Sequence, residues 1–480
     1  MRASSRCASS KKLWLTSAVG AFAALAMAGT AWTAEGPKKD ELFKVTHVIQ
    51  VPGAAAFFSF DISWYDRHLN KYFLADRNNQ AVEVIDGATH TLTQYKNAGF
   101  QGFSGNNDTS GPDGIATVNN HTEVWVGDNP GKVWVQDSTT LAVKALPGGA
   151  TNPILVGGTT RADEFCTDTK NHVVMIASPA EDPPYVSFIS TQTYKVVGKL
   201  IFDGLNLPMT AGIGHAPLKA TNGLEQCGYS EETGKLYQNV PEVSGAGNDT
   251  SPGYVAVIDG KTMNVQKSFL IPLDACAGPQ GMTMGPDNQI LLGCNASSPN
   301  GHRNLAVINQ HSGAILKSIP DLGGADEVWY NDGDGHYFIV SCNTACRTAP
   351  GAGTEGPELL GVVDANGLRV DQSVTIAMHN SDTAPTGSAR TAHSVAANSR
   401  TNEVYVPIPA GPGGGVPHFG SSLCNSTGAG IVVTGTPSSA TGCIVILKAK
   451  HDDRSRIAHE RDRDDRRDGD GDRDDRRDRD

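Results

Sequence analysis

Seven polar residues recur at one position of a repeated sequence pattern, and five of them are carboxylic acids. Each stands ten or eleven residues before a short apolar run such as YFLA, EVWV or YFIV. In chain order the residues are Asp61, Asp113, Asp163, Glu225, Gln280, Asp326 and His393. If the repeats fold alike, these side chains meet, and carboxylates held close together repel one another unless a cation or shared protons neutralise them. The pattern therefore predicts a cation site or a ligand site.

The donor atoms at this position favour hard divalent cations. Carboxylate and amide oxygens suit Ca²⁺ or Mg²⁺, and an added imidazole also admits Mn²⁺, Zn²⁺ or Fe²⁺. Glu164 and Glu327 directly follow two of the seven positions and are further candidate ligands. We expect Ca²⁺ first, with Mg²⁺ or Mn²⁺ as alternatives. A solvated acidic mouth without a cation is the other interpretation, because polar residues are ordinary where a strand begins.

His393 is the candidate catalytic residue, because its imidazole could act as a general base near neutral pH. The alternative interpretation is an ordinary surface histidine. The chain has no GxSxG motif, so a serine nucleophile of that type is not expected. The GPGGG run at 411 is not followed by Lys-Ser or Lys-Thr, and we expect no nucleotide cofactor.

The elements that must position these residues are short strands with tight polar turns. DISWY, KYFLA and QAVEVID, between residues 61 and 86, form one such unit, and the chain contains seven copies about fifty residues apart. This period is typical of an all-β, seven-bladed β-propeller built from four-stranded antiparallel blades. The candidate residues then open the innermost strands around a central channel. Residues 44–52 predict one more strand, which closes the ring by completing the last blade.

Three segments divide the chain. Residues 1–34 combine a basic start with an apolar stretch and small residues, which predicts a secretory signal peptide, an uncleaved anchor being the alternative. Residues 35–450 form the propeller. Residues 451–480 are rich in Asp and Arg and predict a disordered tail. The expected location is periplasmic or secreted, with no membrane contact after signal cleavage.

Eight cysteines remain after the signal segment, and an even number in an exported chain favours disulfides. Cys342 with Cys346 and Cys424 with Cys443 are the most local pairs. A pair within the fifth blade (276 and 294) and a pair joining the third and fourth blades (166 and 227) are also possible. Buried free thiols are the alternative. We expect at least two bridges.

The formal net charge of −12 argues against nucleic acid, whose binding requires a basic surface. Long loops between the second and third strands of the repeats, and between successive repeats, are expected on the face that carries the seven positions. A small-molecule ligand or substrate, and a protein partner on this long-loop face, are therefore both expected.

Two kinds of segment carry a resemblance to known families. AVEVIDGATHTL at 81 and YVAVIDGKTMNV at 254 share a strand-turn-strand pattern, and GPDGIATV at 111 and GPQGMTMGPDNQILLG at 278 share a Pro-x-Gly strand start. These segments resemble the YVTN/YncE-like and NHL-type β-propellers over most of residues 44–450, which implies the propeller fold. ADEVWYNDGDGHYFIV at 325 more weakly resembles the SMP-30/gluconolactonase group, which implies a divalent cation at the channel mouth.

Three functions remain open at this point. The first is binding of a small ligand, a divalent cation or both at the acidic channel mouth, without catalysis. The second is a metal-dependent hydrolase or lyase of the lactonase or esterase kind. The third is a protein-interaction scaffold that uses the long loops.

Overall fold

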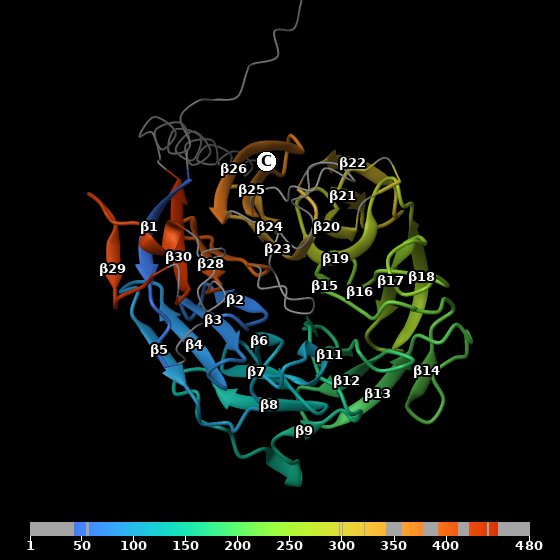
Figure 1. The fold of residues 1–480 in the computed structure, drawn as a ribbon. Coiled ribbons are helices and arrows are strands. Elements are labelled where there is room, and N and C mark those ends of the chain that lie inside the picture. The colour runs from blue at the N-terminus through green and yellow to red at the C-terminus, as the bar shows by residue number, and fades with distance from the viewer. Residues whose placement is uncertain are drawn as a thin grey trace, which may run out of the picture. The chain divides into compact units, whose positions relative to one another are not determined.

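Seven β-sheets account for the described part of the chain, which we analyse in a computed structural model (Figure 1). The structure describes residues 43–53, 57–296, 298–299, 301–320, 322–341, 358–377, 392–410, 422–438 and 441–449. All of them belong to the second of two units, 39–480. The signal peptide and the Asp/Arg-rich tail predicted above lie outside the described residues. Within these ranges, no helix has the length and hydrophobicity needed to cross a bilayer.

The first three blades follow one another along the chain, and the sheets pair their consecutive strands side by side. Blade 1 contains β2 (Ser63–Asp66), β3 (Lys71–Asp76), β4 (Ala81–Asp86) and β5 (Leu92–Tyr95). Blade 2 contains β6 (Ile115–Val118), β7 (Glu123–Asp128), β8 (Lys132–Asp137) and β9 (Ile154–Leu155). Blade 3 contains β10 (Phe165–Asp168), β11 (Val173–Ser178), β12 (Tyr185–Ser190), β13 (Val196–Ile201) and β14 (Ile213–His215).

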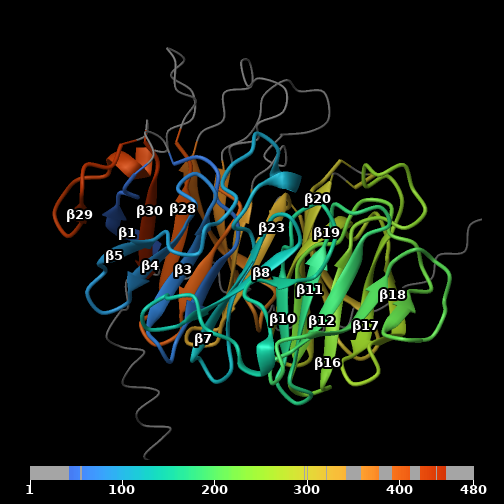
Figure 2. The same cartoon turned by 90° about the horizontal axis from the view of Figure 1, so that it is seen from below.

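The next three blades repeat the four-stranded antiparallel pattern. Blade 4 contains β15 (Cys227–Ser230), β16 (Lys235–Val240), β17 (Gly253–Asp259) and β18 (Asn264–Ile271). Blade 5 contains β19 (Ala277–Met284), β20 (Gln289–Ala296), β21 (Asn304–Asn309) and β22 (Ile315–Pro320). Blade 6 contains β23 (Ala325–Asn331), β24 (His336–Ser341), β25 (Glu358–Asp364) and β26 (Arg369–Ala377). Figure 2 shows the strands from the side.

Blade 7 joins the two ends of the propeller, as the sequence predicted. It contains β27 (Ala396–Asn398), β28 (Glu403–Ile408), β30 (Cys443–Ala449), β1 (Phe43–Ile49) and β29 (Val432–Thr434). The N-terminal strand β1 runs antiparallel to β30, pairing Val48 with Val445. The prediction of four-stranded blades is extended in two sheets, because β14 and β29 each add a short parallel strand at an outer position.

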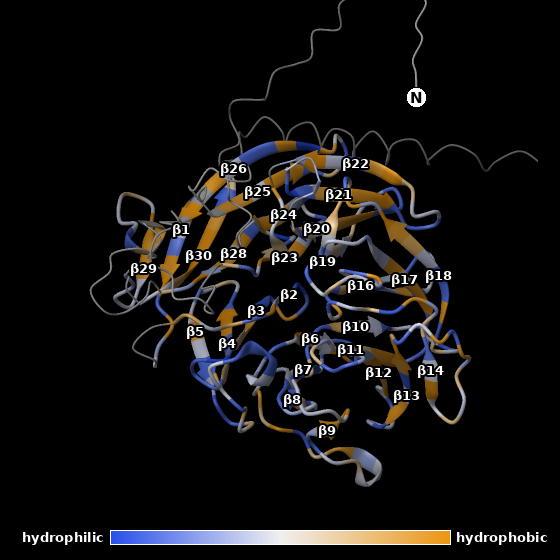
Figure 3. Ribbon diagram, turned by 45° about the vertical axis from the view of Figure 1, so that its right-hand side comes forward, coloured by the Kyte–Doolittle hydropathy of each residue, from blue (hydrophilic) through white to orange (hydrophobic). Residues whose placement is uncertain are grey.

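Apolar packing between neighbouring blades forms the core. Seven buried clusters each join two adjacent blades, and together they cover every neighbouring pair around the ring. Both faces of the middle strands are therefore buried, as in β7, where all six residues are inaccessible. Burial on both faces explains why the sequences of these strands contain continuous apolar runs. Several of these runs appear orange in Figure 3.

Three disulfides occur in the described residues: Cys166–Cys227, Cys276–Cys294 and Cys424–Cys443. The first ties the innermost strands of blades 3 and 4, and the others lie within blades 5 and 7. The expectation of at least two bridges is confirmed. Cys342 and Cys346 lie outside the described residues. The described residues also contain three short 3-10 helices: η1 (Asn107–Thr109), η2 (Pro147–Gly149) and η4 (Ser422–Asn425).

Candidate functional site at the channel mouth

The seven predicted residues lie in the first half of the innermost strands β2, β6, β10, β15, β19, β23 and β27, or up to three residues before them. A repeated backbone hydrogen bond shows that four of them occupy equivalent places. The amides of Asp61, Asp113 and Asp163 donate to the carbonyls of Ala75, Gly127 and Ala177 at 2.9–3.0 Å, and Glu225 donates likewise to Asn239 at 3.2 Å. The innermost strands also contact one another around the whole ring. We call this end of the channel, defined by the seven residues, the ring mouth.

Glycines let the innermost strands converge at the ring mouth. A Cβ atom on Gly114 would lie 1.8 Å from the carbonyl oxygen of Asp163, and one on Gly281 would lie 2.9 Å from that of Asp326. Neither distance is compatible with a side chain. These two glycines belong to the Pro-x-Gly segments of the sequence, so the motif has a steric cause: its glycine lets the innermost strand of one blade pass close to the backbone of the next.

Two arginines lie among the carboxylates, Arg77 buried and Arg161 partly buried, and sequence reasoning missed both. Arg77 follows β3, is only 2% exposed, and forms an ion pair with both Asp61 and Asp113 through its guanidinium. Arg161 precedes β10, and its Nε lies 2.7 Å from Asp163 Oδ2. A signal for Arg77 was present in the sequence, since it directly follows a second strand, and this end of that strand lies on the same side as the ring position.

The arginines leave the ring mouth with an excess of carboxylates. Five acids face two guanidiniums, and His393 is the seventh member. The buried oxygens Asp113 Oδ2 and Asp163 Oδ1 have no hydrogen-bond partner among the described residues. A buried charged oxygen without a partner is costly, and either protonation or a cation removes the cost.

Three of the predicted residues come together as a possible cation site. One donor atom each from Asp61, Asp326 and His393 lies within 4.8 Å of the others, and these residues open blades 1, 6 and 7. His393 Nε2 is 3.4 Å from Asp61 Oδ1. The imidazole stacks on the ring of Phe60 at 5.1 Å and an interplanar angle of 9°, which fixes its orientation.

The ring residues of blades 4 and 5 form a hydrogen-bonded pair. Gln280 Nε2 donates to Glu225 Oε1 at 3.3 Å. This bond satisfies one oxygen of Glu225 with an amide rather than a charge. The seven residues therefore form two arginine-bound groups, one amide-bound pair and the Asp61–Asp326–His393 cluster, with Asp61 shared between the Arg77-bound group and the cluster.

The pKa values at the ring mouth diverge because burial and neighbouring charges compete. Burial raises the pKa of Asp163 to about 7, against an opposing effect of Arg161. Burial also raises the pKa of Asp113 and Glu225 well above the ordinary carboxyl range. Burial acts on Asp61 in the same direction, but Arg77 and a hydrogen bond with His393 hold its pKa below the ordinary value. Asp61 therefore stays anionic at neutral pH.

Glu164 and Glu327, the two additional predicted ligands, lie one residue further along the strands. Glu327 Oε2 accepts hydrogen bonds from the Ser394 hydroxyl and, at 3.3 Å, from the backbone amide of Ser63. These bonds join blades 6, 7 and 1, so the Glu327 carboxylate takes part in contacts between blades. Glu164 is buried and lines the channel, and its burial raises its pKa well above the ordinary range.

A cavity of about 450 Å³ lies within the channel, beside these glutamates. Aromatic and thioether side chains from the innermost strands form much of its wall: Trp64, Phe165, Tyr229, Met282, Met284, Trp329 and Tyr330. Glu164, Gln226 and Glu327 supply polar groups on the same wall. A mostly apolar cavity of this size with a few polar groups suits a small organic molecule.

Comparison with known proteins adds no assignment. No family model matches the chain, and no curated protein matches it. The fold is a seven-bladed β-propeller, a fold that serves many functions, so only the residues of the site indicate what this protein does.

Proposed function

We propose that this protein is an exported binding propeller that holds a divalent cation at the ring mouth through Asp61, Asp326 and His393. The observation that carries the proposal is the convergence of their three donor atoms within 4.8 Å from three different blades. Two carboxylates and one imidazole suit Ca²⁺, Mg²⁺ or Mn²⁺, and the carboxylate excess favours Ca²⁺. The three disulfides support export to an oxidising compartment.

The cation would have a second role as one end of a ligand site. The cavity beside the ring mouth accommodates a small organic molecule against Trp64 and Trp329, whose rings pack edge to face at 5.4 Å. A ligand that carries a carboxylate or hydroxyl group could place that group at the cation and its apolar part along the aromatic wall. We therefore expect the preferred ligands to be small, partly apolar and oxygen-bearing.

Calorimetric titration of the metal-free protein with Ca²⁺, Mg²⁺ and Mn²⁺ tests the cation. The parent protein should bind Ca²⁺ saturably, and Asp326→Asn should weaken binding by about tenfold or more, because a charged ligand becomes a neutral one. Asp332→Asn is the matched control, since Asp332 belongs to the same blade but pairs with Arg67, away from the ring mouth. Equal Ca²⁺ affinity in the two variants, or no binding by the parent, would contradict the proposal.

A hydrolytic function is a second candidate, and Asp163 favours it. A carboxyl with a pKa near 7 is suited to accept a proton from water at neutral pH, and Asp163 lies among the ring residues. Hydrolysis of lactones and aryl esters should then require Ca²⁺ and fall by about 100-fold or more in Asp163→Asn. Ca²⁺ binding without turnover of any such substrate would leave the binding function and remove the hydrolytic one.

A further inference from the structure

The opposite end of strand β2 carries a second aspartate with different neighbours. Asp66 ends β2 and is buried, with its side chain only 1% exposed. Its Oδ1 accepts hydrogen bonds from the backbone amides of His68 at 2.8 Å and Leu69 at 3.0 Å. These bonds fix the carboxylate and direct Oδ2 toward the neighbouring blade. The side chain is therefore placed before any ligand arrives.

His121 reaches Asp66 from blade 2. Its Nδ1 lies 2.5 Å from Asp66 Oδ2. The turn that holds His121 is unusual, because three successive non-glycine residues, Asn119, Asn120 and His121, have positive φ values of 53°, 52° and 63°. The Asn119 side chain anchors this turn by donating to Glu123 Oε2 at 2.8 Å. The imidazole is thus held in place by the fold of its own blade.

His68 completes the group from the turn after β2. Its ring centroid lies 4.0 Å from that of His121. One donor atom each from Asp66, His68 and His121 lies within 4.8 Å of the others. We call this end of the channel, defined by these three residues, the turn mouth. Donor atoms around one tetrahedral Zn²⁺ lie about 3.3 Å apart, so a metal ion would replace the 2.5 Å hydrogen bond between His121 and Asp66, and rotation of the exposed His68 side chain would bring in the third donor.

We propose that Asp66, His68 and His121 bind a transition-metal ion of the zinc class at the turn mouth. Two imidazoles and one carboxylate select Zn²⁺, Co²⁺, Ni²⁺ or Cu²⁺ over Ca²⁺, which prefers oxygen donors. Three protein ligands leave a fourth tetrahedral position for water or another ligand. His121 also lines the channel cavity, so that position is close to any molecule bound in the channel.

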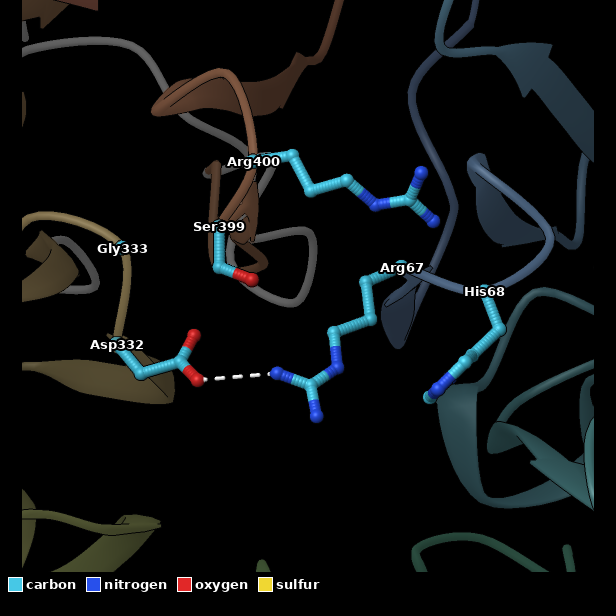
Figure 4. Close-up of a pocket in the computed structure, with 6 residues that line it drawn as sticks. All are labelled: Arg67, His68, Asp332, Gly333, Ser399 and Arg400. Atoms are coloured by element: carbon cyan, nitrogen blue, oxygen red, sulfur yellow. Dashed lines mark hydrogen bonds and ion pairs between the residues drawn. The ribbon is translucent and has the colours of Figure 1, made fainter. Parts of the chain in front are cut away.

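Two arginines lie near the site, and their positive charges would weaken the binding of a metal ion. Arg67 and Arg400 line a surface hollow of about 340 Å³ together with His68, Asp332, Gly333 and Ser399. Figure 4 shows the Arg67 side chain extending to Asp332 rather than toward His68, and the two charged groups are 3.1 Å apart. Asp332 therefore offsets the charge of Arg67, whereas Arg400 shares the hollow with His68 and would oppose a bound metal ion.

Titration with Co²⁺ tests this site, because bound Co²⁺ gives d–d absorption that reports imidazole ligation. The experiment requires protein without a polyhistidine tag. Excess Ca²⁺ is present throughout, so that Co²⁺ bound at the ring mouth does not contribute to the absorption. The parent should show saturable Co²⁺ absorption that Zn²⁺ abolishes by competition. Asp66→Asn should weaken Co²⁺ binding by about 10- to 100-fold, and His68→Ala and His121→Ala should weaken it by about 100-fold.

Matched variants separate metal binding from folding. His68 is exposed, so His68→Ala should leave the melting temperature of the metal-free protein unchanged and decides the question if His121→Ala does not fold. His172→Ala is the control, because His172 is an exposed histidine with positive φ in the corresponding turn of blade 3. Equal Co²⁺ affinity in His68→Ala and His172→Ala, or no Co²⁺ absorption in the parent, would overturn the proposal.

Discussion

The two ends of strand β2 place aspartates in contrasting surroundings. At the ring mouth Asp61 is buried beside Arg77, with Asp326 and His393 close to it. At the turn mouth Asp66 is held by backbone amides and His121. The first setting concentrates oxygen donors and charge, whereas the second combines one carboxylate with two imidazoles. The comparison shows how one innermost strand can present hard-cation chemistry at one end and zinc-type chemistry at the other.

The largest predicted difference between the two mouths concerns their arginines. Arg77→Met should lower the free energy of unfolding by about 3–5 kcal/mol, because it leaves Asp61 and Asp113 buried without their counter-charge. Arg67→Met should cost less than about 1 kcal/mol, since the Arg67–Asp332 pair is more than half exposed. Urea unfolding of both variants measures the difference. Similar losses in the two would show that Arg77 is not the counter-charge of the ring mouth.

The pH dependence of stability should also differ between the mouths. The folded pKa of Asp163 is about 7 and its ordinary value is 3.8, so on lowering the pH through 7 the folded protein binds a proton that the unfolded chain does not. The free energy of unfolding of the Ca²⁺-free protein should therefore rise from about pH 8 to about pH 6, by at most about 1.4 kcal/mol per pH unit for this one group. Asp163→Asn should flatten the rise. An unchanged slope in this variant would remove Asp163 as the cause.

Asp66 should behave in the opposite way. Burial alone would raise its pKa, but hydrogen bonds from Thr117, Leu69 and His121 together lower it. Asp66 therefore contributes stability above the ordinary carboxyl pKa, and that stability is lost as the pH falls through its lower folded value. Asp66→Asn should consequently reduce stability at neutral pH and have little effect in strong acid, as measured by urea unfolding at both pH values. An equal loss at the two pH values would contradict this account.

The smallest predicted effect concerns the charge beside the turn mouth. Arg400→Gln should tighten Co²⁺ binding by about twofold, because it removes a cation that shares a hollow with His68. Arg67→Gln should change the affinity less, since Asp332 already offsets Arg67. Co²⁺ titrations at low and high salt measure both effects, and added salt should reduce the difference. A weaker Co²⁺ affinity in Arg400→Gln would mean that Arg400 supports the site by another route.

The fold and the ring positions could be predicted because the repeat preserves register. Counting back from each second strand located Asp61, Asp113 and Asp163 without knowledge of any contact, since equivalent residues of equivalent blades must converge. Arg77 and Arg161 could not be located in this way, because they stand at different offsets in their repeats and reach the carboxylates through long side chains.

The turn mouth was also beyond sequence reasoning. His68 and His121 come from turns of different blades and from different places within those turns. Their proximity depends on the conformation of the turn at 119–121, where three residues adopt positive φ, and on the angle between blades 1 and 2. No repeated spacing in the sequence reports either quantity, so the sequence did not single out these two histidines.

Thermal melting with and without a Ca²⁺ chelator tests the central claim, a cation between Asp61, Asp326 and His393, most directly. The chelator should lower the melting temperature of the parent and Ca²⁺ should restore it, since a ligand at a hundredfold excess over its dissociation constant stabilises the fold by about 2.7 kcal/mol. Asp326→Asn should lose most of this response, whereas Asp332→Asn and His68→Ala should keep it. A parent that melts identically under both conditions, or an Asp326→Asn variant that responds like the parent, would contradict the account.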